Sequence, residues 1–250
     1  MRFWARTGCR WVNGQFKCDT GDCGAQPNNF GVECKGISGQ SPATLVELTL
    51  SSSGGSDFYD LSNVDGNNLN IEFGPIPGTY QKVNNPDLGK FNCGTPGCRF
   101  NQQLCPPEIQ LETSSGKYCM SICAAVYNGQ QVQKHQDILG PIARDEMKRD
   151  LVCCACGAGN GGCQDPRSHY CCSPLDPRSN IGGRCYVQNW PKPSQFFDRY
   201  DRVFKNQCPD AYSWQFDDVS STYQCVDADY SIKFCPWTLI NWFNKFKSLF

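Results

Sequence analysis

The sequence predicts a mainly β, loop-rich fold, on three observations. Short runs of alternating apolar and polar residues, bounded by Gly, Pro, Asn and Asp, recur along the chain. Long stretches of helical periodicity are nearly absent. The 250 residues include 24 Gly, 16 Pro and 19 Cys, a composition typical of turns and disulfide-bonded loops. A chain of this length can form one large β domain, or a β domain with smaller satellites.

In chain order, residues 3–7 predict a short strand, and two cysteine loops follow at 9–18 and 23–34. The stretch 43–71 predicts two central strands, with a Gly/Ser-rich turn at 51–56 between them. A second turn is expected at Asp65-Gly66. Residues 70–73 continue the sheet, and the Gly- and Pro-rich residues 74–78 interrupt it.

Alternation along the two central strands separates apolar from acidic side chains. Val46, Leu48 and Leu50 share one face of the first strand, so Glu47 points to the other face. In the second strand, Phe58 and Asp60 share a face. The carboxylates lie either on an ordinary solvated sheet face or in an acidic cleft for a neutral polymer or a cation.

The cysteine content bears on compartment and metal binding. Cysteines in this number, spread over nearly the whole chain, stay paired only in an oxidising compartment. We therefore expect a secreted protein, although no signal peptide is recognisable. Zinc is the alternative for one dense run, which is Cys153, Cys154, Cys156 and Cys163. That run lacks C-x-x-C pairs, and neither His135 nor His169 is at ligand spacing, so disulfides are favoured, with no metal or cofactor.

The charge balance excludes one class of partner. The chain carries 23 basic and 24 acidic side chains, whereas phosphate binding requires a basic excess. We therefore expect no nucleic acid as a partner.

Six motifs in one order resemble the thaumatin-like, or pathogenesis-related group 5, family. They are RFWARTGC (2–9), KCDTGDCG (17–24), PATLVELTL (42–50), DFYDLSNVDGNN (57–68), CPDAYSWQFDD (208–218) and YSIKFCP (230–236). The resemblance covers roughly residues 2–236, with a Cys-rich insertion at about 128–168. Family members have further strands upstream, so the resemblance indicates an N-terminally truncated chain.

The fold implied by the resemblance is a β-sandwich (1–92 and 209–236) with its first strands missing. A disulfide-rich, partly helical second domain (93–208) and a small third lobe complete it, with an acidic cleft between the first two domains.

Within the insertion, the residues from Pro141, including Ile142, Met147 and Leu151, predict a short amphipathic helix. We interpret this helix as a decoration of the second domain. The apolar and basic tail 237–250 is too short to span a bilayer, and is expected either at a membrane interface or against a sheet edge.

The resemblance also implies a disulfide pattern. The pairs are Cys9–Cys18, Cys23–Cys34, Cys93–Cys225, Cys98–Cys208, Cys105–Cys119, Cys123–Cys171 and Cys172–Cys185. Two extra bridges are expected among Cys153, Cys154, Cys156 and Cys163, although the adjacent Cys153 and Cys154 should not pair with each other. The family partner of Cys235 lies in the missing upstream region, so the resemblance predicts that Cys235 forms no disulfide within this chain.

Five cleft residues are implied by the family motifs: Arg6, Glu47, Asp60, Asp65 and Asp217, with Asp218 as an adjacent alternative for the last. Such carboxylates accept strong hydrogen bonds from sugar hydroxyls. Phe58, Tyr59, Phe73 and Tyr212 are candidates to stack on sugar rings. Asn67 and Asn70 depart from the family pattern beside the cleft. The alternative interpretation is a structural ion cluster, in which Arg6 pairs with an Asp and no ligand binds.

Clustered carboxylates also suit glycoside hydrolysis, which needs two carboxyls about 5 Å apart for retention or more than about 6.5 Å apart for inversion. Glu47 is the expected acid and Asp60 the expected base or nucleophile, while Arg6 would keep the neighbouring Asp ionised. For a monomeric protein, three function classes remain, of which the family resemblance implies the first most directly. They are a defence protein that binds β-1,3-glucan of fungal walls, a weak endo-β-1,3-glucanase, and an inhibitor or stress protein that acts through its loops.

Overall fold

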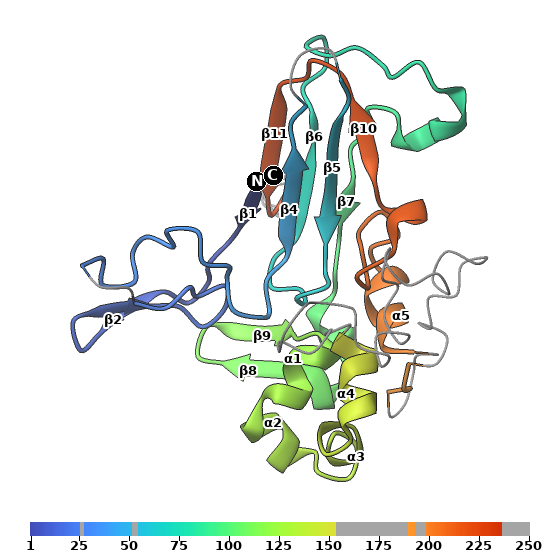
Figure 1. Cartoon of the computed structure of the whole chain (residues 1–250). Helices are drawn as coiled ribbons and strands as arrows, with labels where there is room; N and C mark the ends of the chain where they lie inside the picture. Colours follow the sequence, from blue (N-terminus) through green and yellow to red (C-terminus); the bar gives the residue numbers. More distant parts are fainter. Residues whose placement is uncertain (26–27, 52–54, 154–189, 194–198, 237–250) are drawn as a thin grey trace, which may run out of the picture.

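The computed structural model describes residues 1–25, 28–51, 55–153, 190–193 and 199–236. Two antiparallel sheets form its upper part in Figure 1, and short helices form its lower part. The four-stranded sheet has the order β1 (Arg2–Trp4), β4 (Leu45–Thr49), β5 (Asp57–Ser62) and β10 (Tyr223–Cys225). The three-stranded sheet has the order β11 (Tyr230–Phe234), β6 (Ile71–Pro75) and β7 (Gly97–Cys98).

Smaller elements surround the two sheets. A hairpin of β2 (Arg10–Val12) and β3 (Gln15–Lys17) lies in an arm that projects from the sheets (Figure 1), and a second hairpin joins β8 (Gln110–Thr113) and β9 (Gly116–Cys119). The α-helices are α1 (Ile122–Tyr127), α2 (Gly129–Lys134), α3 (Gly140–Ala143), α4 (Glu146–Cys153) and α5 (Tyr200–Lys205). The 3-10 turns are η1 (Pro86–Phe91), η2 (Gln102–Leu104), η3 (Pro107–Ile109) and η6 (Asp218–Ser220).

Aromatic side chains fill the space between the two sheets. Tyr59 of β5 is 1% exposed, and its ring centroid lies 5.5 Å from that of Phe73 on β6 and 5.1 Å from that of Tyr230 on β11. The Tyr59 hydroxyl donates to the carbonyl of Gly94 at 2.6 Å, so its polar end is satisfied. This packing makes the two sheets a sandwich. It also removes Tyr59 and Phe73 from the candidates for sugar stacking, because both rings are buried.

The predicted alternation is confirmed within β4, where Val46 and Leu48 are buried. Leu50 is 52% exposed, because the strand ends at Thr49 and the alternation ends with it.

The predicted interruption at 74–78 begins later than expected. Gly74 and Pro75 still pair with Ser231 and Tyr230, and the chain turns only at Ile76, whose carbonyl accepts from the Thr79 amide at 3.1 Å. Residues 70–73 therefore lead into the second sheet and do not extend the first.

The segment interpreted as a decoration is part of the core. It folds as two helices instead of one, because the Asp145 side chain accepts from the Lys148 amide at 3.2 Å and caps the start of α4. Ile142, Leu151 and Val152 are all buried in the same cluster as the sheet residues. These side chains cover apolar surface of α1, so removing the segment would expose the core.

Six disulfides lie within the described residues, and five are predicted pairs: Cys9–Cys18, Cys23–Cys34, Cys93–Cys225, Cys98–Cys208 and Cys105–Cys119. The prediction of Cys123–Cys171 is wrong, because Cys123 bonds Cys153. The physical reason is that α4 folds back onto α1 and brings these two Cα atoms to 4.7 Å. Cys153 is therefore not available for a bridge within the insertion run. Cys154, Cys156, Cys163, Cys171, Cys172 and Cys185 lie outside the described residues, and the expectation for Cys235 stays a prediction.

Disulfide mapping tests this correction. Proteolysis without reduction is expected to yield a peptide pair that joins the segment around Cys123 to the segment around Cys153. The Cys105–Cys119 pair serves as an internal control. Recovery of Cys123 bonded to Cys171 by mass spectrometry would contradict the packing of α4 on α1.

Across the described residues, none of the helices has the length and apolar character needed to cross a membrane. The tail 237–250, for which the sequence predicts a membrane or sheet-edge role, lies outside that part of the chain.

Candidate functional site

An acidic row crosses the four-stranded sheet on the face opposite the aromatic core. The strand register sets Arg2 of β1 directly opposite Glu47 of β4, and Glu47 directly opposite Asp60 of β5. Arg2 Nε lies 2.5 Å from Glu47 Oε1. Side chains directly opposite each other in such a sheet have Cβ atoms about 4.5–5.5 Å apart. Residues from three strands, far apart in sequence, thus form one continuous row of ionisable side chains, called the acidic row below.

Asp60 is the member of the acidic row whose pKa is shifted most. Burial, followed by the negative charges of Glu47 and Asp218, raises the pKa of Asp60 to about 8, while Arg2 opposes this shift more weakly. Within the described chain, its Oδ1 atom is buried and has no hydrogen-bond partner. Asp60 therefore keeps its proton at neutral pH and can donate a hydrogen bond, unlike an ordinary carboxylate.

Tyr212 and Asp218 extend the acidic row beyond β5. The Tyr212 amide donates to the Leu61 carbonyl at 2.8 Å, which holds the tyrosine beside the end of β5. Its hydroxyl donates to Asp218 Oδ1 at 2.8 Å and lies 2.5 Å from Thr222 Oγ1. Asp218 and Tyr212 both interact electrostatically with Asp60, so the two side chains belong to the same electrostatic cluster as the acidic row.

Asp65 lies at the turn after β5, as the sequence predicts. Its carbonyl accepts from the Ala43 amide at 3.1 Å and from Ser41 Oγ at 2.6 Å, so the turn is bound to the chain that leads into β4. Burial raises the pKa of Asp65; Arg2 opposes the shift and Glu47 adds to it. Because Asp65 interacts electrostatically with Arg2 and Glu47, we include it with the acidic row.

Arg6, the predicted cleft arginine, is engaged elsewhere. Its guanidinium lies 2.6 Å from Asp22 Oδ1, donates to the Val32 carbonyl at 3.1 Å and lies 5.1 Å from the ring centre of Phe16. Arg6 thus anchors the projecting arm, as in the structural alternative, and Arg2 supplies the charge beside Glu47. The two arginines share one motif, and only the register of β1 on β4 distinguishes them.

Asp217 also has a structural partner. Its carboxylate lies 2.8 Å from Lys205 Nζ of α5 and accepts from Ser220 Oγ at 2.6 Å and from Ser213 Oγ at 3.1 Å. This ion pair ties α5 to the loop before β10. The neighbouring Asp218, the stated alternative, is the one that interacts with Asp60.

Two stacking candidates remain near the acidic row, the exposed Phe58 and the partly buried Tyr212. Phe58 lies two residues from Asp60 on β5, therefore on the same face, and is 46% exposed. Among the described residues, no group of three or more His, Cys, Asp or Glu side chains is arranged to hold a metal ion. The acidic row with Phe58 thus offers carboxyls, a guanidinium and an aromatic ring, which are the groups that bind hydroxyl-rich neutral polymers.

Comparison with known proteins adds to this geometry. The model of the thaumatin family matches residues 1–138 and 143–236. Thaumatin-like protein 1 of Pyrus pyrifolia is 34% identical, over 94% of this chain and 71% of its own length. Pathogenesis-related protein 5 of Arabidopsis thaliana is 32% identical, over 94% of this chain and 70% of its own. A protein of Prunus avium named glucan endo-1,3-beta-glucosidase is 32% identical, over 94% of this chain and 71% of its own.

Proposed function

Because the chain belongs to the thaumatin family, we propose that it is a secreted, defence-type protein that binds β-1,3-glucan through the acidic row. The observation that supports this most is the alignment of Arg2, Glu47 and Asp60 across three strands, with the exposed Phe58 ring beside them. Arg2 and the protonated Asp60 donate hydrogen bonds, and Glu47 accepts them. A neutral sugar hydroxyl can satisfy both kinds of group.

Binding to insoluble β-1,3-glucan, with cellulose and chitin as comparison polymers, tests this proposal. We expect Glu47→Ala to weaken glucan binding by at least about tenfold, since a hydrogen bond to a charged group contributes about 1.5–3 kcal/mol. Glu72→Ala is a matched control. Glu72 is also paired with a cation across a strand, Lys233 at 2.6 Å, and its side chain is 27% exposed against 28% for Glu47. Glu72 lies in the other sheet, so its loss should leave glucan binding unchanged.

Two results would count against glucan binding by the acidic row. One is equal binding of the wild-type chain to all three polymers, and the other is an equal effect of Glu47→Ala and Glu72→Ala. Selective binding that no substitution in the acidic row changes would favour the third class, an inhibitor or stress protein that acts through its loops.

A weak endo-β-1,3-glucanase is the second candidate, favoured by the raised pKa of Asp60 beside Glu47. The electrostatics of the two carboxyls support the reverse of the roles expected from the sequence, in which Glu47 was the acid and Asp60 the base or nucleophile. Asp60, which holds its proton to about pH 8, suits the general acid. Glu47, held by Arg2, suits the base or nucleophile. Glu47→Gln should then retain glucan binding and abolish release of reducing sugar, whereas unchanged hydrolysis would remove Glu47 from this role.

A further inference from the structure

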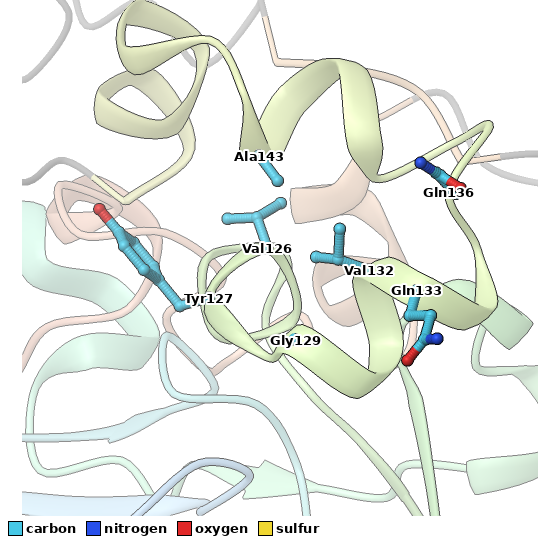
Figure 2. Close-up of a pocket in the computed structure, with 7 residues that line it drawn as sticks. All are labelled: Val126, Tyr127, Gly129, Val132, Gln133, Gln136 and Ala143. Atoms are coloured by element: carbon cyan, nitrogen blue, oxygen red, sulfur yellow. The ribbon is translucent and has the colours of Figure 1, made fainter.

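A cavity of about 480 Å³ opens among α1, α2 and α3, and none of its lining residues belongs to the acidic row. This volume falls within the roughly 300–1,000 Å³ that is usual for small-ligand sites. Val126, Val132 and Ala143 form an apolar floor, with Tyr127 on one side and Gln133 and Gln136 on the other (Figure 2). The cavity therefore has an apolar base and polar walls.

The helices that build the cavity are fixed in place by hydrogen bonds. The Asn128 side chain accepts from the amides of Gln130 and Gln131, both at 3.1 Å, and so caps α2. The side-chain amide of Gln131 donates to the Gln110 carbonyl at 2.6 Å, which ties α2 to β8. Val126, at the floor, is only 5% exposed. The site is thus formed before any ligand arrives, which lowers the entropic cost of binding.

Tyr127 offers a large aromatic surface at the cavity. Tyr127 is 63% exposed, so much of its ring is open to a ligand. The Arg149 guanidinium carbon lies 6.0 Å from the ring centre, and Arg149 Nη1 donates to the Ala143 carbonyl at 2.8 Å. Arg149 therefore restrains the ring from outside the cavity lining, through a weak cation–π contact.

The opposite wall carries two exposed amides. Gln133 and Gln136 each offer two N–H donors and one carbonyl acceptor. Within the part of the chain that the structure describes, neither side-chain amide has a hydrogen-bond partner. No lining residue carries a formal charge. A ligand that matches these walls is neutral, has a flat apolar face and carries hydroxyl groups at its edge.

We propose that this cavity binds a neutral pyranose ring of a glycan, as a second sugar site separate from the acidic row. The C–H face of the ring packs on Tyr127 and the apolar floor, and the ring hydroxyls bond to the amides of Gln133 and Gln136. A single glycan chain or two neighbouring chains can then contact the protein at two places, which strengthens attachment to a polymer by effective concentration.

NMR spectroscopy of the full-length protein tests the sugar site. The probe is a soluble β-1,3-linked glucose pentasaccharide, with the β-1,4-linked pentasaccharide as a second sugar. Side-chain amide signals of Gln133 and Gln136 are assigned by their loss in Gln133→Ala and Gln136→Ala. We expect these signals to shift and saturate with at least one sugar. Tyr127→Ala should weaken the affinity at least tenfold, and Tyr127→Phe should retain most of it.

Gln130→Ala is the matched control, because Gln130 is an exposed glutamine of the same helix that does not line the cavity. It should leave the titration unchanged. Glu47→Ala should also leave it unchanged, which separates this site from the proposed function of the acidic row. Amide signals that respond to neither sugar, or that respond equally in Tyr127→Ala, would overturn the proposal. Shifts caused by the apolar dye 1-anilinonaphthalene-8-sulfonate and by neither sugar would also overturn it.

Discussion

Asp60→Asn is expected to stabilise the folded protein, and the gain should grow as the pH rises from about 4 to about 8. In the unfolded chain an aspartate loses its proton near its usual pKa of 3.8, whereas burial and the charges of Glu47 and Asp218 raise the pKa of Asp60 to about 8 in the fold. The protonated group favours the folded state fully below pH 3.8, and this contribution is lost as the pH rises through 8. Asparagine cannot ionise, so above pH 8 the variant should exceed the wild type by at least about 2 kcal/mol.

Urea unfolding with the disulfides intact, at pH 5, 7 and 9, measures this difference. Glu72→Gln, which removes a carboxylate from the other sheet, is the control for general charge effects. A difference between Asp60→Asn and the wild type that stays constant from pH 5 to pH 9 would contradict the proposed electrostatics of the acidic row. The same result would weaken the assignment of Asp60 as a general acid.

Tyr59→Ala is expected to cause the largest loss of stability, about 3–5 kcal/mol, because it empties the centre of the sandwich. The ring is 1% exposed and lies within 5.6 Å of three other aromatic rings, those of Phe73, Tyr223 and Tyr230. Tyr59→Phe keeps these contacts and loses only the hydroxyl bond to the Gly94 carbonyl, so about 1–2 kcal/mol should be lost.

Thermal and urea unfolding of both variants checks this prediction. Phe58→Ala is a matched control on the same strand, since Phe58 is 46% exposed and points to the opposite face. Its effect on stability should be small, while its effect on glucan binding should be measurable. Similar stability losses in Tyr59→Ala and Phe58→Ala would contradict the assignment of the two faces.

The alternation of residues along the strands and the family motifs were sufficient to predict much of the fold. Alternation at Val46, Glu47 and Leu48 correctly separated the buried face from the acidic face, since a strand places successive side chains on opposite sides. The family motifs correctly paired cysteines as distant as Cys93 and Cys225. Alternation also directed Glu47 away from the buried face, and the family resemblance identified Glu47 and Asp60 as cleft residues.

The remaining features depended on which segments meet in space. Arg2 replaces Arg6 beside Glu47 because of the register between β1 and β4, and alternation within one strand does not encode register. Cys153 takes the place of Cys171 because α4 folds back onto α1. The cavity beside Tyr127 exists only because three short helices converge there. Sequence alone determined the faces of the strands, since these follow from local geometry, and the family resemblance correctly implied five of the six disulfides within the described residues. Tertiary structure decided the charge partners, the raised pKa of Asp60 and the cavity beside Tyr127, since these arise from contacts between separate elements.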